Sequence, residues 1–346
     1  MTAYGRDMLR TLLVATLAVT TLAGCSPDPD AAAGPTPSAA PDSPSASAPS
    51  SRRPTDDSEP PSPRSSSGST PRATRPPEPV QFDRDRALGH VRVLAGRIGP
   101  RLATGPAFGE AATYVERRLT RAGYDVSRQR FGVPAGDSWG VPVAAGTSLN
   151  VVATPPGFDP GSPHRLVGAH LDTVAVAPGA EDNASGVAVL LELARLASSG
   201  DTRLPAMLVA FGGEEPRGPG DDLHHFGSRA YVRGMSAAER RGLRGMVSLD
   251  RVGVGGRVPV CTGPLSGPRV RDALLGVARR LDIPTVSCGV NTSSDHWSFE
   301  KVGHEVARLG STPYAGYHSA GDVPSVVGGD QLGRVGRLTW GWLRSG

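Results

Sequence analysis

Carboxylate and imidazole side chains follow the ends of several apolar runs in this sequence, and these residue types could bind a metal ion or move a proton. They lie in five short motifs, which read HLD, DNASG, GEE, LD and YHSAGD. Imidazole nitrogens and carboxylate oxygens are typical ligands of zinc and of other hard-to-borderline divalent ions. The candidate ligands and proton carriers are His170, Asp172, Asp182, Glu214, Glu215, Asp250, Tyr317 and His318.

Taken singly, each of these residues has an ordinary structural explanation. A lone histidine beside an aspartate, as at His170, is usually a surface hydrogen bond, and Asp182 could cap the helix that follows it. Glu214 and Glu215 could be a solvated pair, and Asp250 could form an ion pair with the arginine that follows it. Their joint occurrence at corresponding places in the sequence favours a site for a pair of divalent ions.

The apolar pattern also predicts the elements that must position these side chains. Strands are predicted over 149–153, 165–169, 206–211, 246–249 and 305–309, and helices over 83–97, 108–122, 184–198, 269–281 and 331–343. Continuous apolar strands that alternate with helices indicate a mostly parallel sheet covered on both faces. In such sheets functional sites form beyond the carboxyl ends of the strands, which is where the candidates lie.

The HLD motif predicts that a carboxylate contacts the side of the imidazole ring that faces away from a bound metal ion. In an extended chain His170 and Asp172 point to the same side. We therefore expect the Asp172 carboxylate to hold the imidazole, an arrangement that metal-bound histidines usually have.

The order and spacing of HLD, DNASG, GEE, LD, SDHWSF and YHSAGD resemble those of the M28 family of zinc exopeptidases, which includes secreted bacterial aminopeptidases. The resemblance covers residues 83–346, including the segment LAGRIGPR and the strand NVVA. It implies a three-layer α/β/α domain with a mixed, mostly parallel central sheet of the phosphorylase/hydrolase-like kind. It also implies two zinc ions as cofactors.

By motif position, the resemblance assigns a ligand set. Asp182 would bridge the two zinc ions. His170 and Asp250 would complete one zinc site, and Glu215 and His318 would complete the other. In such enzymes the peptide bond that follows the bridging aspartate is often cis.

The resemblance also assigns catalytic roles. Glu214 would be the general base, which takes a proton from the attacking water and passes it to the leaving amine, and Tyr317 could stabilise the oxyanion. Ser294, Asp295 and His296 superficially suggest a serine triad, but three consecutive residues cannot converge and no GxSxG elbow exists. We therefore interpret Asp295 as support for the metal site.

One segment departs from the family pattern. Residues 216–226, PRGPGDDLHHF, separate the GEE motif from a Gly-Ser pair, and we expect this loop to border the substrate cleft. Its two histidines, His224 and His225, are expected to be solvated. Arg251 stands where many relatives have an apolar residue, so the substrate preference on that side stays open.

The amino terminus has the pattern of an export signal. Arg6 and Arg10 precede an apolar run over residues 12–23, which is shorter than the roughly 20 residues that span a bilayer. Residues 1–24 are therefore predicted to be a secretory signal peptide. The run ends in LAGC, which resembles the lipobox of bacterial lipoproteins and predicts a lipid on Cys25.

Composition separates a tether from a folded domain. Of 33 prolines in the chain, 15 lie between residues 26 and 80, together with 13 serines. Such a segment cannot bury enough apolar surface to fold, so residues 25–80 are predicted to be a lipid anchor and a disordered tether. The remaining 266 residues, 81–346, can form one large α/β domain. Cys261 and Cys288 form an even pair in an oxidising space, either as a disulfide or as two buried thiols.

The expected function is that of a dizinc aminopeptidase, lipid-anchored on the outer face of the cell membrane. It would act as a monomer on peptides with a free N-terminus. The net charge is +4 and the arginines are interleaved with acids, which argues against a nucleic-acid partner. The alternatives are a glutaminyl cyclase with one zinc ion, a carboxypeptidase, and a non-catalytic lipoprotein that binds peptides.

Overall fold

The computed structural model describes residues 81–346. The predicted signal peptide, the lipidation site Cys25 and the tether lie outside the described residues. Within the described part, no helix has both the length and the apolar character needed to cross a membrane.

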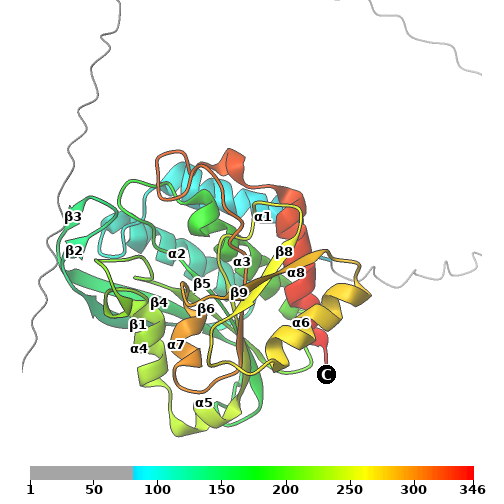
Figure 1. Cartoon of the computed structure of the whole chain (residues 1–346). Helices are drawn as coiled ribbons and strands as arrows, with labels where there is room; N and C mark the ends of the chain where they lie inside the picture. The colour runs from blue at the N-terminus through cyan, green and yellow to red at the C-terminus, as the bar shows by residue number, and fades with distance from the viewer. Residues whose placement is uncertain (1–80) are drawn as a thin grey trace, which may run out of the picture. The chain divides into compact units, whose positions relative to one another are not determined.

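An eight-stranded sheet forms the centre of the domain (Figure 1). In spatial order its strands are β1 (Asp125–Val133), β4 (Gly146–Thr154), β6 (Ala206–Phe211), β5 (His164–His170), β7 (Leu243–Leu249), β10 (Val306–Leu309), β8 (Val258–Thr262) and β9 (Thr285–Val290). The central strands β6, β5, β7 and β10 are parallel neighbours. On one side β4 is antiparallel to both β1 and β6, and on the other side β8 is antiparallel to β10 and parallel to β9. The predicted mixed, mostly parallel sheet is confirmed. A separate hairpin, β2 (Gly136–Asp137) with β3 (Pro142–Val143), lies outside this sheet.

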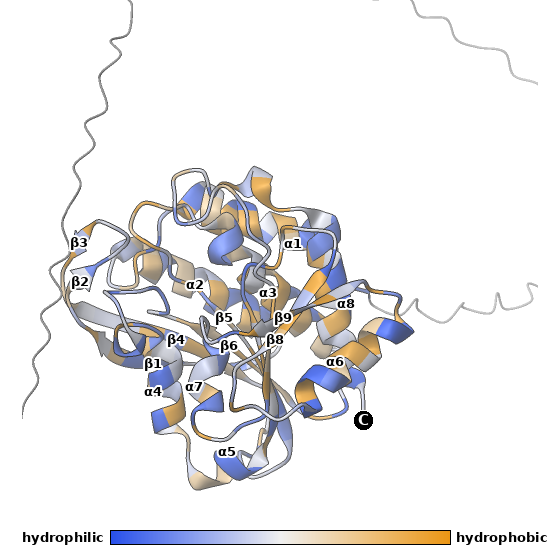
Figure 2. Cartoon of the chain, in the orientation of Figure 1, coloured by the Kyte–Doolittle hydropathy of each residue, from blue (hydrophilic) through white to orange (hydrophobic). Residues whose placement is uncertain are grey.

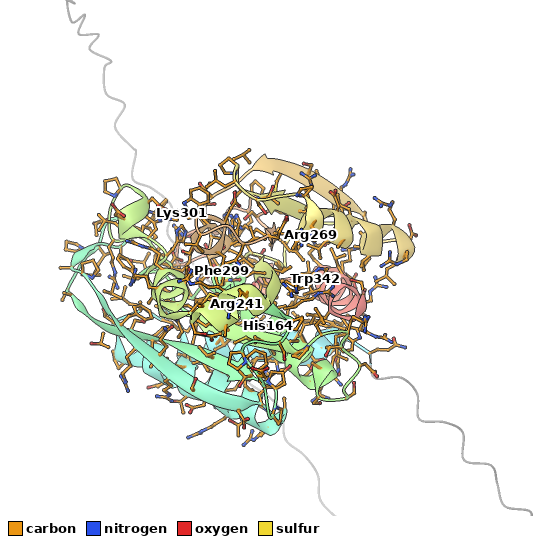
Figure 3. All side chains as sticks on the ribbon, turned by 90° about the horizontal axis from the view of Figure 1, so that it is seen from below. His164, Arg241, Arg269, Phe299, Lys301 and Trp342 are labelled. Carbon is orange, nitrogen blue, oxygen red and sulfur yellow. A yellow bond between two sulfur atoms is a disulfide. The ribbon has the colours of Figure 1, made fainter. Side chains whose placement is uncertain are left out.

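Helices cover both faces of the sheet and divide the core into two clusters. The larger cluster lies under α1 (Arg84–Val91), α2 (Pro106–Arg121), α3 (Ser185–Ala197), α6 (Arg269–Arg280) and α8 (Gly329–Arg344), and it includes Trp342. The smaller cluster lies under α4 (Phe226–Gly234) and α7 (His296–Glu300), and it includes Phe299 (Figure 3). The short α5 (Ala237–Gly242) follows α4. Figure 2 shows apolar and polar sides alternating along α6, as burial of one helix face requires.

The segments between strands and helices carry several short turns. A π-helical turn, η1 (Arg92–Ile98), continues α1 and completes the helix predicted over 83–97. The other short turns are η2 (Ala180–Ala184), η3 (Asp221–Leu223) and η4 (Pro324–Val326). Cys261 of β8 and Cys288 of β9 form a disulfide with their Cα atoms 5.3 Å apart.

The sheet topology explains why the candidate residues meet. Because β6, β5, β7 and β10 run in the same direction, their carboxyl ends lie along one edge. His170 is the last residue of β5, Asp250 follows β7 directly, and Glu214 lies three residues after the end of β6. The DNASG turn lies in η2 at the start of α3.

A glycine is required at the start of α3. A Cβ atom at Gly186 would lie 2.4 Å from the Leu249 carbonyl oxygen and 2.5 Å from Asn183 Oδ1. Both neighbours hold the turn in place, because Asn183 Nδ2 donates to that same carbonyl at 2.8 Å and Gly186 N donates to Asn183 Oδ1 at 2.9 Å. The peptide bond between Asp182 and Asn183 is cis.

Candidate metal centre

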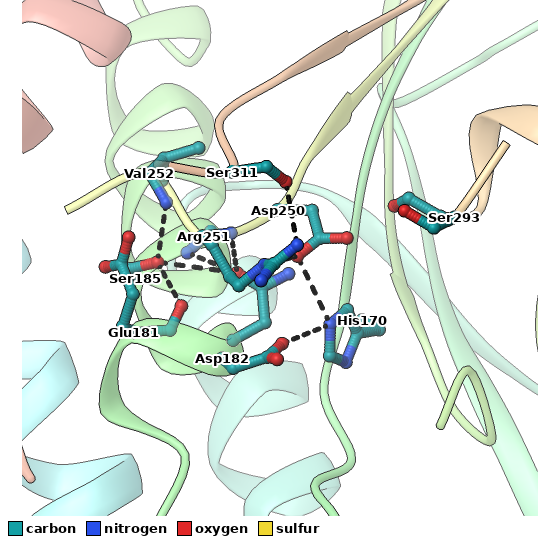
Figure 4. Close-up of polar contacts among 12 residues, drawn as sticks. His170, Glu181, Asp182, Ser185, Asp250, Arg251, Val252, Ser293 and Ser311 are labelled. Atoms are coloured by element: carbon teal, nitrogen blue, oxygen red, sulfur yellow. Dashed lines mark hydrogen bonds and ion pairs between the residues drawn. The ribbon is translucent and has the colours of Figure 1, made fainter. Parts of the chain in front are cut away.

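Asp182 lies between two histidines that come from distant parts of the chain. Its Oδ1 is 3.0 Å from His170 Nε2, and its Oδ2 is 3.2 Å from His318 Nε2. His170 ends β5, whereas His318 lies in the loop after β10 and has φ 50°. Figure 4 shows Asp182 pointing from the turn before α3 toward His170. The two oxygens of one carboxylate are thus directed to two different imidazoles.

Three more carboxylates complete the cluster. Glu215 Oε2 lies 3.2 Å from His318 Nε2, while Asp250 Oδ1 lies 3.7 Å and Glu214 Oε2 lies 3.9 Å from His170 Nε2. The six side chains of the cluster belong to residues that are each at most 7% exposed. Within the described residues, two groups bring ligand atoms within 4.8 Å of one another: His170, Asp182 and Glu215, and His170, Glu214 and Asp250.

The turn that presents Asp182 is held by a buried acid, Asp322. Its two carboxylate oxygens accept hydrogen bonds from Glu181 N at 2.8 Å and from Asp182 N at 3.1 Å. Glu181 in turn accepts from the amides of Gly253 and Val254. Asp322 is the last residue of the YHSAGD motif, but the motif alone indicated no role for it.

Asp172 supports the site differently from what the sequence suggested. The atom closest to His170 Nδ1 is the Asp172 backbone carbonyl oxygen at 3.2 Å, while carboxylate Oδ1 is farther away at 3.8 Å. The carboxylate instead accepts from Glu214 N at 3.1 Å and Glu215 N at 3.2 Å. It therefore fixes the backbone of the GEE motif, and the imidazole is held by the main chain.

Two arginines flank Asp250. Arg308 Nη2 forms an ion pair with Asp250 Oδ2 at 2.9 Å, and Arg251 Nε lies 3.8 Å from Oδ1. Arg251 also donates to Ser311 Oγ at 3.0 Å (Figure 4), and its guanidinium lies over the Tyr317 ring. Arg308 was not among the sequence candidates, because an arginine inside a short apolar strand carries no sign of its partner.

Burial and charge act on the pKa values in opposite directions. Burial raises the pKa of Glu214 to about 8 and that of Glu215 to about 8. Burial also opposes ionisation of Asp250, but the Arg308 guanidinium outweighs it and holds the pKa of Asp250 below its usual range. For His318, burial lowers the pKa, yet the contacts with Asp182 and Glu215 raise it to about 10.

These side chains fit a divalent cation. Glu215 Oε1, Asp250 Oδ1 and His318 Nδ1 are buried and have no hydrogen-bond partner among the described residues. Buried polar atoms without partners are costly, and buried carboxylates are normally paired or coordinate metals. A cation-free cluster of four carboxylates would have to hold protons, as the raised pKa values of the two glutamates indicate.

Aromatic residues form the rim of the cleft. The Tyr317 ring stacks on His318 with centroids 3.8 Å apart, and Trp139 packs edge-on against His318 at 4.3 Å. Trp139, which sequence analysis did not single out, follows β2 and is 54% exposed. Asp295 and His296 are fully buried, and His296 Nε2 contacts the Asn291 carbonyl oxygen at 2.8 Å.

The expectation for one loop histidine was wrong. His225 was expected to be solvated, but it is 3% exposed and its Nε2 lies 3.4 Å from Glu214 Oε1. Its neighbour His224 is half-buried. Both histidines line the same cleft as Asp182 and Arg251, so the loop does border the candidate site.

A known peptidase family matches the segment of the chain that forms this cluster. The profile of peptidase family M28 matches residues 150–343, a segment that contains every side chain of the cluster. Among curated proteins, leupeptin-inactivating enzyme 1 of Streptomyces exfoliatus is 29% identical over 233 residues, which cover 64% of this chain and 47% of that protein. The chain spans about half the length, or less, of the curated relatives that it matches.

Solved structures share the fold. A zinc aminopeptidase from Bacillus subtilis superposes with a TM-score of 0.67 at 19% identity, covering 75% of this chain and 94% of that one. A glutaminyl cyclase from Fimbriiglobus ruber superposes with a TM-score of 0.62 at 23% identity, covering 78% and 99%. At these identities the likeness concerns the fold, whereas the family profile covers more than half of the sequence. The chain belongs to peptidase family M28.

Proposed function

We propose that this chain is a zinc-dependent aminopeptidase that holds two zinc ions and acts on peptides outside the cytoplasm. The observation that carries the proposal is Asp182, whose two oxygens face two histidines within a buried cluster of carboxylates. One carboxylate can therefore serve two cations. His170 and Asp250 would bind the first zinc ion, and Glu215 and His318 would bind the second.

The residues around the cluster have the chemistry that peptide hydrolysis needs. When bound, two zinc ions lower the pKa of a shared water and polarise the scissile carbonyl. Glu214 is left as the general base: its carboxylate takes the proton of the attacking water and passes it to the leaving nitrogen. Tyr317, which stacks on His318 at the rim, would donate a hydrogen bond from its hydroxyl to the oxyanion.

The family members and fold neighbours named aminopeptidases support a substrate with a free N-terminus. The cleft is lined by Asp182, Glu214, Glu215 and Asp250, which suit the ammonium group of such a substrate. A glutaminyl cyclase has the same fold, so the overall structure does not separate the two activities. A carboxypeptidase and a peptide-binding protein without activity are the remaining alternatives.

The proposal also assigns roles to the segments that precede the peptidase domain. Residues 1–24 would direct export, a lipid on Cys25 would anchor the chain to the outer face of the membrane, and residues 25–80 would connect this anchor to the peptidase domain, residues 81–346. Replacing Cys25 by Ser should move the protein from the membrane fraction to the medium while its specific activity stays the same. Membrane association that persists in this variant after residues 1–24 have been removed would rule out the lipid anchor.

The activity is tested by metal analysis and a panel of substrates on the purified mature chain. We expect two zinc equivalents, hydrolysis of amino-acid p-nitroanilides, loss of hydrolysis with a chelator and its recovery with zinc. N-acetylated peptides should resist cleavage, and N-terminal glutaminyl peptides should yield no pyroglutamate. Less than one zinc equivalent with full activity would overturn the two-ion site, and cleavage from the C-terminus would replace the aminopeptidase by a carboxypeptidase.

A further inference from the structure

His225 is held against the strand end that carries Glu214. It precedes α4 and has φ 56°, a left-handed conformation in which few residues other than glycine occur. Its backbone N–H donates to the Glu214 carbonyl oxygen at 3.0 Å, and the N–H of Phe226 donates to the Gly213 carbonyl oxygen at 2.7 Å. The loop that leaves the GEE motif therefore returns to it and directs His225 inward.

The side chain of His225 contacts the side chain of the same glutamate. Its Nε2 lies 3.4 Å from Glu214 Oε1, while Glu214 Oε2 lies 3.9 Å from His170 Nε2. The two oxygens of Glu214 thus have different neighbours: Oε1 faces His225, and Oε2 faces the cluster.

The protonation state of His225 depends on its burial and on the charged groups around it. Its Nδ1 lies 3.9 Å from Asp221 Oδ1 and has no hydrogen-bond partner among the described residues. The other oxygen of Asp221 is ion-paired with Lys301, and Asp295 and Asp250 add negative charge nearby. Burial outweighs these acids and lowers the pKa of His225 to about 4. At neutral pH its imidazole is therefore uncharged and carries one N–H.

We propose that His225 is a positioning residue for the general base, and that its Nε2–H holds Glu214 Oε1 so that Oε2 stays directed at the cluster. The inference rests on the proposed function of Glu214. During hydrolysis an O–H bond of water breaks as its oxygen bonds to the scissile carbonyl carbon, and the proton moves to Glu214 Oε2. The C–N bond then breaks, and the same proton passes from Glu214 to the leaving nitrogen. The proton on His225 Nε2 stays in place throughout, so no further acid or base is needed.

Two substitutions separate this role from simple packing. A glutamine side chain places an amide N–H about as far from the backbone as Nε2 does, so His225→Gln keeps the donor, whereas His225→Leu removes it. His164→Leu is the matched control, because His164 is equally buried but lies at the start of β5, at the end of that strand away from His170.

The experiment measures kcat, KM, zinc content and thermal unfolding for the full mature chain and these variants. His225→Leu should lower kcat by about 10- to 100-fold, the range expected when a base is misplaced, with KM and zinc content unchanged. His225→Gln should recover most of kcat, and His164→Leu should match the wild type. In a Glu214→Gln background, His225→Leu should cause no further loss, because it acts through the missing base.

Several outcomes overturn the inference. One is a His225→Leu variant with the kcat of the wild type, and another is an equal loss of kcat in His225→Leu and His225→Gln. The others are loss of zinc from both of these variants, and a loss of kcat in the Glu214→Gln background as large as the loss in the wild-type background. A zinc-loaded wild type without peptidase activity is a different result, because it overturns the proposed function and the role of His225 with it.

Discussion

Arg308 Nη2 lies 2.9 Å from Asp250 Oδ2, and both residues are almost fully buried. The same guanidinium reaches Asn291 Oδ1 at 2.9 Å and Ser293 Oγ at 2.8 Å. One side chain thus ties the end of β7 to the loop before α7. It also occupies one oxygen of Asp250 and leaves Oδ1 directed at His170.

Replacing Arg308 by Met should therefore destabilise the domain strongly. Removing one partner of a buried ion pair typically costs about 3–5 kcal/mol, because the other charge is left uncompensated. Urea unfolding of zinc-free protein measures this cost directly. Arg269→Met is the control, since Arg269 is exposed and its 3.9 Å contact with Glu305 should contribute less than about 1 kcal/mol. Equal stability of the two variants would show that the Arg308 pair is not structural.

Replacing Glu214 by Gln should lower turnover by orders of magnitude while the metal stays bound. The amide has nearly the same shape as the carboxylate but cannot accept the proton of water, so kcat should fall by about 100- to 10,000-fold. Zinc content, measured on the same preparation, should equal that of the wild type because Glu214 is not assigned as a ligand. A variant with near-normal turnover would remove Glu214 from the mechanism.

The disulfide between Cys261 and Cys288 should stabilise the edge of the sheet. It joins residues separated by 27 positions, and closing a loop of this size contributes about 3.5 kcal/mol in the chain-entropy view. The double variant Cys261→Ser, Cys288→Ser should therefore unfold at lower urea concentration. Reductant should lower the stability of the wild type toward that of the variant and leave the variant itself unaffected. Equal effects of reductant on both proteins would contradict this role.

His90 should make stability depend on pH. Burial lowers the pKa of His90 to about 4, from 6.5 in the unfolded chain. Between these values the unfolded chain binds more protons than the folded one, so the free energy of unfolding rises with pH. The contribution is complete above pH 6.5 and is lost as pH falls toward 4, and it amounts to at most about 3 kcal/mol.

Comparing wild type with His90→Leu isolates this contribution, because other buried histidines titrate equally in both proteins. Urea unfolding across this range of pH should show a shallower decline at low pH for the variant. Parallel curves would mean that His90 is protonated to the same extent in the folded and unfolded chains.

The sequence predicted the centre of the sheet well and its edges poorly. Strands β5 and β6 are buried along their whole length, so their apolar residues form continuous runs. β1 reads DVSRQRFGV and exposes most of its residues, and β9 is exposed from its second residue to its last, so neither strand has the alternating apolar residues that would identify it. β8 reads VPVCT, and its proline, Pro259, argues against a strand inside a sheet when only the sequence is known.

Specific contacts between residues far apart in the sequence could not be predicted either. The motifs predicted which side chains gather, because parallel strands end along one edge. They did not predict that Arg308 meets Asp250, because this pair depends on the register that places Arg308 beside Ser248. His225 was missed for a related reason: its burial follows from a loop that returns to the residue it left, and no local pattern encodes that return.

The position of Asp182 between two histidines has a consequence for biosynthesis. The first histidine, His170, precedes it by 12 residues, whereas His318 follows it by 136. During synthesis from the N-terminus, His170 and Asp182 therefore emerge long before His318. In the proposed two-ion site the second half depends on His318, so an incomplete chain would not retain both ions and loading would await release of almost the whole domain. If the chain is exported before folding, the ions must come from the compartment in which it folds.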